Sequence, residues 1–313
     1  MKTKKTPNKT KMTIKKVVIS GTFFDKDLKY VKGGLLLVKN FPPIRDILHS
    51  KNKEKSLFNS CKDADMVIFY MQGNSPQILD RLKQIADKIK IKKVFWSQDS
   101  HHLSDFELKI ASKFDKLFIA HSPYLDKFKD FPAYWMPLSF VISIDDLKKI
   151  IVNKIFLQSP NKMLDVVFPH RPYDIGDRKK LNNIIKNKLQ NKLRFFSGPV
   201  SVKKYKDVLL WSKVILNISL FNDLNLRNFE AWALNKVLLT NKVPDHDKIK
   251  GIDLSHTYFF LRDLSDFDQA LDSALKDKGE INTSQYILNK HTIIYRYIDI
   301  INKTLKTNYK VCI

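Results

Sequence analysis

Residues 211–220 read Trp-Ser-Lys-Val-Ile-Leu-Asn-Ile-Ser-Leu, and residues 231–241 read Ala-Trp-Ala-Leu-Asn-Lys-Val-Leu-Leu-Thr-Asn. The apolar, β-branched run from Val214 to Leu220 is typical of a buried parallel strand. Residues 229–234 predict a short helix, and Val237 to Thr240 predict the next strand. A strand, a helix and a strand this close together predict a Rossmann-like unit, which binds ligands where loops leave the carboxyl ends of its strands. We therefore expect Glu230, at the start of the predicted helix, to lie at a binding site.

The same alternation of short apolar runs and helical patterns extends along most of the chain. Strands that alternate with helices predict parallel sheets, and 313 residues are enough for two domains that each bury a core. The sequence therefore predicts an α/β fold with two Rossmann-like domains. Further strands are predicted at residues 15–20, 66–70, 93–96, 116–120, 133–136, 164–168, 192–196 and 257–261, and helices at residues 77–89, 105–112, 178–189, 202–211 and 267–275.

Four segments of the chain carry a resemblance to a known family. The motif Arg227-x-Phe-Glu230-Ala-x-Ala-Leu-x-Lys-x-Leu-Leu-Thr240 resembles the donor-site motif of GT-B glycosyltransferases. It is most similar to the group that resembles the spore maturation protein CgeB, within the glycosyl transferases group 1 family. The other three segments follow the order of that family: Phe95-Trp96-Ser97-Gln98-Asp99, then Asp165-Val-Val-Phe168 followed by Arg178, and His291-Thr292 with Tyr295-Arg296.

The resemblance implies parallel sheets that face each other across a cleft, and a terminal helix that crosses back onto the first domain. We expect a basic, disordered arm at residues 1–16, an acceptor domain at 17–145, a nucleotide-sugar donor domain at 146–283 and the crossing helix at 284–313. Residues 147–157 are expected to form a linker helix, and residues 284–304 a single long helix.

The candidate donor site consists of residues that suit a nucleotide sugar. The resemblance implies that Glu230 holds the donor ribose, and a carboxylate can accept hydrogen bonds from both hydroxyls of a cis-diol. Arg178 and Arg227 are candidates for the diphosphate, because a guanidinium reaches two phosphate oxygens at once. An alternative for Glu230 is structural, since the dipole of a helix favours an anion near its first turn.

Two further donor-side candidates come with the motif, and one comes from the first domain. Phe229 precedes Glu230. Asn222 occupies the position where the stricter GT-B pattern has a second glutamate, and Asn235 stands where that pattern has a glycine. Gly21, after the first strand, is expected to let the backbone approach the sugar or the phosphates, and the pair Gly33-Gly34 is expected to do the same.

The candidate catalytic residues follow predicted strands of the first domain. Asp99, His101 and His102 come after the strand at 93–96, and His121 follows the strand at 116–120. A carboxylate or an imidazole can take the proton from an acceptor hydroxyl. The alternative for the Ser-His-His segment is a solvated turn.

The sequence does not predict a metal site. Asp-x-Asp triplets begin at Asp25, Asp63, Asp245 and Asp266, and we interpret all four as surface turns. The sequence also lacks a phosphate-binding glycine-rich fingerprint. We expect a metal-independent reaction with no cofactor beyond the nucleotide-sugar co-substrate, for which a UDP-sugar is the first expectation.

The charge of the chain is the other strong signal. It carries 56 Lys and Arg against 32 Asp and Glu, for a net charge of +24. Such an excess draws polyanions, although the base composition of the gene is an alternative source of part of the lysine. It favours an anionic hydroxyl acceptor, either a glycolipid or polysaccharide or a hydroxylated DNA base, and it allows contact with DNA or an anionic membrane surface.

The same charge also fits an alternative function, which is non-catalytic nucleic-acid binding on a Rossmann-like scaffold.

Cys61 and Cys312 neither build a disulfide framework nor have the spacing of a metal site. No apolar run is long enough to span a bilayer. We therefore expect a soluble, cytoplasmic protein. It would be peripheral to a membrane if its acceptor is membrane-associated, and associated with DNA if its acceptor is a DNA base.

Overall fold

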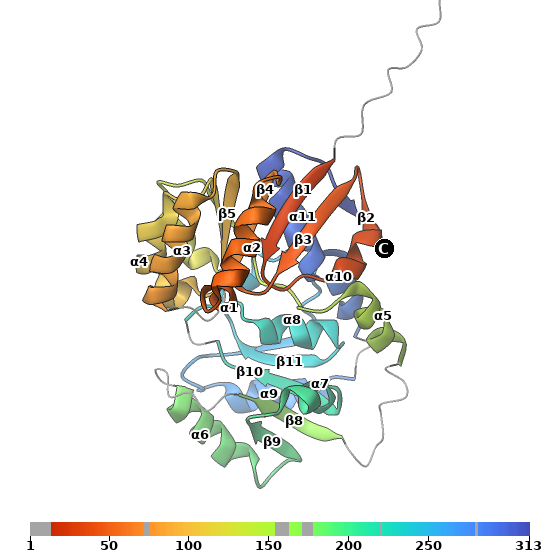
Figure 1. Ribbon diagram of the computed structural model, residues 1–313. Helices are drawn as coiled ribbons and strands as arrows, with labels where there is room; N and C mark the ends of the chain where they lie inside the picture. The colour runs from red at the N-terminus through yellow and green to blue at the C-terminus, as the bar shows by residue number, and fades with distance from the viewer. Residues whose placement is uncertain (1–13, 72–74, 154–162, 171–177, 220, 279–280) are drawn as a thin grey trace, which may run out of the picture.

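The structure is a computed structural model that describes residues 14–71, 75–153, 163–170, 178–219, 221–278 and 281–313. It has two lobes, one above the other in Figure 1, and each is built on a parallel sheet. The first lobe holds six strands in the order β3-β1-β4-β5-β6-β7. The second lobe holds five in the order β12-β11-β10-β8-β9.

The strands of the first sheet are β1 (Lys15–Ser20), β3 (Leu36–Phe41), β4 (Met66–Met71), β5 (Lys92–Ser97), β6 (Lys116–Ile119) and β7 (Ala133–Trp135). Every residue of the central strand β4 is buried, because helices cover the sheet on both faces. Alternate side chains point to opposite faces. Val67 and Phe69 therefore pack under α1 (Ile44–Leu48), α2 (Lys51–Cys61), α3 (Pro76–Lys88) and α4 (Ser100–Ala111), while Ile68 and Tyr70 pack on the other face.

The second sheet follows the same logic with β8 (Leu164–Pro169), β9 (Phe195–Gly198), β10 (Ser212–Asn217), β11 (Val237–Asn241) and β12 (Thr257–Phe260). One face packs against α6 (Arg178–Leu189) and α9 (Phe267–Lys276). The other face packs against α7 (Val202–Leu210) and α8 (Leu226–Ala233), and α8 lies on the side of this sheet that faces the first lobe (Figure 1).

One continuous hydrophobic cluster joins the two lobes. It contains Trp96 of the first sheet, Trp232 of α8, and Tyr297 of α11 (Ile293–Leu305). The ring of Tyr297 lies 5.6 Å from that of Trp96 and 5.5 Å from that of Phe23. The last helix therefore packs on the first sheet, and the chain ends with β13 (Lys310–Val311) paired antiparallel to β2 (Val31–Lys32).

The predicted single helix at residues 284–304 is wrong. The segment forms two helices, α10 (Thr283–Lys290) and α11, and the break falls at His291 and Thr292. Thr292 is extended and bridges Phe140, whose N–H donates to the carbonyl of His291 at 3.1 Å. The buried guanidinium of Arg296 donates to Nδ1 of His291 at 2.7 Å and to the carbonyl of Leu138 at 3.1 Å, so tertiary hydrogen bonds stabilise the break.

The predicted linker helix at residues 147–157 is α5 (Ile144–Asn153), which begins three residues earlier, and residues 154–162 lie outside the described part of the chain. The first sheet ends at Trp135 and the second begins at Leu164, while the domain boundaries themselves stay predictions. Within the described residues, no helix combines the length and apolar content needed to cross a bilayer.

Candidate functional site

The loops that leave the carboxyl ends of the two sheets contact each other. The N–H of Ser122, just after β6, donates to Oδ2 of Asp245, just after β11, at 3.0 Å. Nζ of Lys248 donates to Oγ of Ser122 at 2.6 Å, and the hydroxyl of Tyr124 donates to the carbonyl of Phe221 at 3.3 Å. Both lobes thus direct the ends where α/β sheets bind ligands toward one shared region.

On the second lobe, Glu230 belongs to a polar group with Tyr205 and Arg227. Its Oε2 accepts a hydrogen bond from the Tyr205 hydroxyl at 2.5 Å and from Nε of Arg227 at 3.2 Å. Nη1 of Arg227 donates to the carbonyl of Pro169 at the end of β8, and the guanidinium lies 5.5 Å from the centre of the Tyr205 ring. Burial raises the pKa of Tyr205, so this phenol stays a hydrogen-bond donor at neutral pH.

The side chains of Arg227 and Glu230 are 18% and 16% exposed, so solvent reaches both. The sequence predicted that Glu230 lies at the start of its helix, and this prediction is wrong. Helix α8 begins at Leu226, because the side chain of Asn225 accepts the N–H of Arg227 at 3.1 Å and caps it. Glu230 therefore lies one turn into the helix, and it is joined to the end of β8 through Arg227.

The remaining donor-side candidates separate in the structure. Phe229 is completely buried against Trp232, so its side chain supports α8 and is closed to a ligand. Asn222 is exposed in the loop after β10 and adopts a left-handed φ of 55°. The side chain of Arg178, the first residue of α6, lies outside the described residues.

The predicted ligand approach of Gly33 and Gly34 is wrong, whereas that of Gly21 stays a prediction beside a role in packing. A Cβ on Gly21 would lie 2.5 Å from Cβ of Tyr70, so the absence of a side chain there is required by core packing. Gly33 and Gly34 contact Asn308 and Tyr309 near the C-terminus, at the amino end of β3. That is the end of the sheet opposite to the lobe contact, so neither glycine is placed to approach a ligand there.

On the first lobe, Asp99 is the N-cap residue of α4, and His101 and His102 lie in the first turn of that helix, where the sequence predicted a loop. His102 is exposed, whereas Asp99 and His101 are half-buried. The rings of His101 and His102 lie 5.5 Å and 4.6 Å from the ring of Phe221 in the second lobe. The predicted catalytic segment therefore faces the loop after β10.

A buried polar network supports the start of α4. Oγ of Ser97 donates to Oε1 of Glu107 at 2.5 Å, and Oγ of Ser100 donates to Oγ of Ser97 at 2.7 Å. Burial raises the pKa of Glu107 to about 7. This network ties the end of β5 to α4, the helix whose first turn carries His101.

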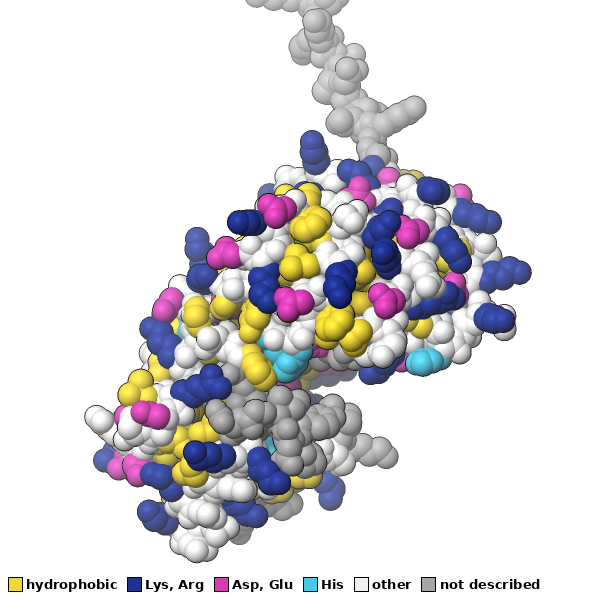
Figure 2. Space-filling model, turned by 90° about the vertical axis from the view of Figure 1, so that its left-hand side faces the viewer, with side chains coloured by type: hydrophobic (Ala, Val, Ile, Leu, Met, Phe, Trp, Pro, Cys, Tyr) yellow, Lys and Arg dark blue, Asp and Glu magenta, His cyan; other side chains and the backbone are white. Residues whose placement is uncertain are grey.

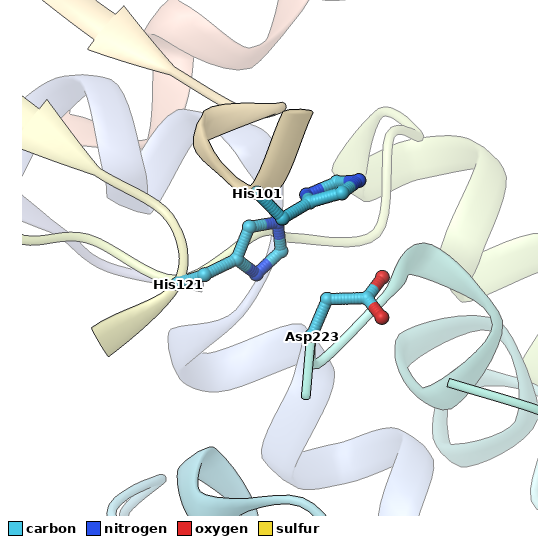
Figure 3. A group of neighbouring side chains, drawn as sticks. All are labelled: His101, His121 and Asp223. Carbon is cyan, nitrogen blue, oxygen red and sulfur yellow. The ribbon is translucent and has the colours of Figure 1, made fainter. Parts of the chain in front are cut away.

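His121 is buried, and its tautomer can be assigned. Nε2 lies 2.9 Å from the carbonyl oxygen of Gln98, which can only accept, so Nε2 carries the proton. In the neutral ring Nδ1 then holds the lone pair, and it has no hydrogen-bond partner among the described residues. Figure 3 shows His121 pointing toward Asp223, a buried residue of the second lobe, with His101 beside them.

The sequence analysis missed Tyr205, Glu107, Phe221 and Asp223. Phe221 and Asp223 lie in the loop after β10, so the rule that sites form after strand ends was a usable signal for them. Tyr205 and Glu107 lie within helices and reach the site region only through tertiary contacts, for which the sequence carries no local signal.

The interpretation of all four Asp-x-Asp triplets as surface turns is wrong for two of them. Asp27 is completely buried and accepts the N–H of Ile144, at the start of α5, at 3.1 Å. Burial raises its pKa to about 6. Asp245 is also completely buried, at the lobe contact. Both carboxylates join segments that are distant in sequence.

On the face that Figure 2 displays, basic and acidic side chains are mixed. Figure 2 shows Lys and Arg side chains over both lobes, with Asp and Glu side chains between them on the face displayed. Ion pairs such as Lys26 with Asp146 at 2.8 Å and Lys188 with Asp268 at 2.7 Å contribute to this mixture. Residues 1–13 of the predicted basic arm lie outside the described part of the chain.

No family model matches the chain, and no curated protein matches it in sequence. Solved structures do match. HepE from Anabaena in complex with UDP and glucose has a TM-score of 0.54 at 9% identity and covers 93% of this chain and 100% of its own. A UDP-forming α,α-trehalose-phosphate synthase from Burkholderia xenovorans has a TM-score of 0.53 at 9% identity, and it covers 95% of this chain and 100% of its own. These likenesses confirm the predicted fold, an α/β GT-B arrangement of two Rossmann-like domains.

Proposed function

We propose that this chain is a glycosyltransferase that moves a sugar from a nucleotide-sugar donor to a hydroxyl acceptor. One observation carries the proposal: Arg227 and Glu230 form a partly exposed polar pair at the carboxyl end of β8, in the lobe whose strand ends meet those of the first sheet. The motif from Arg227 to Thr240 supports the narrower assignment to the CgeB-like group.

In this proposal the second lobe binds the donor. Both hydrogen bonds that Glu230 makes to Tyr205 and Arg227 end on Oε2, so Oε1 would accept the ribose hydroxyls. Arg227 and the amides at the start of α8 would face the diphosphate, since the first turn of a helix favours an anion. UDP is the nucleotide we expect, because the similar HepE structure contains UDP and the similar synthase is UDP-forming.

The first lobe would supply the base that takes a proton from the acceptor. Asp99, His101 and His102 are the exposed or half-exposed candidates, whereas the buried His121 would act by supporting them. A base must come within about 3 Å of the reacting hydroxyl. Contact between the lobes would exclude water from the reaction and limit hydrolysis of the donor.

The acceptor class follows from charge. A net charge of +24 favours an anionic acceptor, for which a glycolipid or polysaccharide and a hydroxylated DNA base are both consistent. A base in DNA would have to be flipped out of the duplex at a cost of a few kcal/mol.

The donor proposal is tested by thermal shift of the full chain with UDP, GDP, TDP and CMP sugars. We expect a UDP-sugar to raise the melting temperature, because it binds the folded state. Glu230→Gln should weaken that sugar about ten- to hundredfold, the equivalent of the roughly 1.5 to 3 kcal/mol of a hydrogen bond to a charged group. The amide keeps an acceptor for Tyr205, so the fold should persist.

Glu54→Gln is the matched control. Glu54 is also paired with an arginine, Arg81 at 2.8 Å, but it lies on α2 of the first lobe. The Glu54→Gln variant should bind the UDP-sugar as the wild type does. Donor binding that is unchanged in Glu230→Gln would overturn the assignment of Glu230. A chain that ignores every nucleotide sugar but binds DNA with a steep dependence on salt would instead be a nucleic-acid-binding protein.

A further inference from the structure

Three side chains from separate segments converge where the lobes meet. His101 lies in the first turn of α4, and Asp223 lies in the loop after β10. His121 is the N-cap of the short 3-10 helix that follows β6. One ligand atom from each lies within 4.8 Å of the other two (Figure 3). The first two residues belong to the first lobe and Asp223 to the second.

His121 is prepared as a ligand. Its Nε2–H donates to the Gln98 carbonyl at 2.9 Å, the kind of hydrogen bond that orients metal-binding imidazoles and sets their tautomer. This leaves the lone pair on Nδ1, which is buried and has no hydrogen-bond partner among the described residues. A buried polar atom without a partner costs about 1 to 3 kcal/mol. Coordination of an ion by Nδ1 would remove that cost.

Asp223 supplies the negative charge. It is 8% exposed, and among the described residues it forms no ion pair despite the large excess of lysine. Its Oδ1 is 3.4 Å from the N–H of Phe221, a long hydrogen bond that leaves most of the carboxylate's capacity unused. The ring of Phe221 stacks on His101 at 5.5 Å and covers one side of the group.

We propose that His101, His121 and Asp223 bind a divalent transition-metal ion, with Zn²⁺ as the best match, that joins the two lobes. Two imidazoles and one carboxylate suit Zn²⁺ and related ions, whereas Mg²⁺ and Ca²⁺ prefer oxygen ligands throughout. Ligand bonds of about 2.0 to 2.1 Å place neighbouring ligand atoms about 3.3 Å apart in a tetrahedral site. The ligand atoms lie within 4.8 Å of one another, so side-chain rotation would have to bring them closer by up to about 1.5 Å to reach that geometry.

The proposal goes beyond glycosyl transfer and does not depend on it. The ion would stabilise the arrangement in which the lobes touch, because the ligands come from both. If His101 and His121 bind a metal, their coordinating nitrogens cannot act as the base, so that role would pass to Asp99 or His102. The sequence-based prediction of a metal-independent reaction stays a prediction, because the proposed ion would join the lobes and need not take part in the reaction.

The test is a titration of the chelator-treated full chain with Zn²⁺, followed by calorimetry and by thermal shift. We expect one equivalent to bind and the melting temperature to rise. Co²⁺ should bind at the same site and give visible absorption typical of tetrahedral coordination. Asp223→Asn and His101→Asn should each lose more affinity than the roughly ten- to hundredfold that loss of a supporting group costs.

His102→Asn is the matched control, because His102 is the neighbouring residue on the same turn but lies outside the group. It should bind Zn²⁺ as the wild type does. Melting temperatures measured without metal show whether the variants fold, and the near-isosteric Asp223→Asn keeps the test valid if a histidine variant does not. Unchanged Zn²⁺ affinity in both ligand variants, or no binding by the wild type, would overturn the proposal. Neither readout depends on UDP-sugar binding.

Discussion

The backbone N–H of Ser122 in the first lobe donates a hydrogen bond to Oδ2 of Asp245 in the second lobe, at 3.0 Å. Ser122 is 8% exposed and Asp245 is completely buried. The Ser122 side chain also accepts from Nζ of Lys248 at 2.6 Å, so a lysine lies close to this contact. Because Ser122 lies just after β6 and Asp245 just after β11, this polar contact joins the carboxyl ends of the two sheets.

Replacement of Asp245 by alanine should destabilise the protein by about 1 to 3 kcal/mol, because the buried N–H of Ser122 would lose its acceptor. Asp245→Asn retains an oxygen and should lose less. The free energy of unfolding in urea measures both effects. Asp247→Ala is the control, since that carboxylate is 65% exposed and pairs only with the exposed Lys242 among the described residues; its change should stay within roughly 0.5 kcal/mol. Equal stability of Asp245→Ala and wild type would show that the contact contributes nothing.

Replacement of Gly21 by alanine should destabilise the fold by about 1 to 3 kcal/mol, the usual effect of overpacking a core. The added Cβ would lie 2.5 Å from Cβ of Tyr70 and 3.0 Å from the hydroxyl oxygen of Tyr297. Urea denaturation together with UDP-sugar thermal shift separates packing from ligand contact. If the variant kept its stability and lost only nucleotide binding, the sequence-based role of Gly21 would be supported.

Stability should depend on pH through Glu107. Its pKa is raised from 4.5 to about 7 by burial, so the folded state keeps the proton over a range where the unfolded chain releases it. The free energy of unfolding should therefore fall as pH rises from about 4.5 to 7, by up to about 3 kcal/mol. Glu107→Gln keeps an acceptor for Ser97 and removes the titration, so it should gain stability relative to wild type across that window. Parallel pH profiles for the two proteins, measured by urea denaturation, would contradict the assignment.

Much of the fold could be predicted because the relevant signals are local. Continuous apolar runs such as those of β1 and β10 are typical of parallel strands that are covered on both faces, and amphipathic helices such as α3 and α9 have a period of 3.6 residues. The predicted strands and helices therefore lie close to the observed ones. Strand β3 was missed because it is an edge strand with only its first and last residues buried, so its pattern resembles a loop.

The candidate site could be predicted only in part. Residues that directly follow strands, such as Asp99 and His121, can be found from sequence because the carboxyl ends of parallel strands meet at one edge. The start of α8 was placed too late because the capping by Asn225 was not recognised, and Phe229 was assigned to the ligand although it packs in the core.

The sequence by itself determined the α/β class, the two Rossmann-like domains and the side chains that follow the strand ends. Only the tertiary structure decided which of those side chains meet. The burial of Asp27 and Asp245, the break between α10 and α11, and the convergence of His101 and His121 on Asp223 all depend on how the two lobes pack. The physical reason is that hydrophobic periodicity reports which face of an element is buried, whereas hydrogen-bond partners distant in the chain are set by the docking of complete elements.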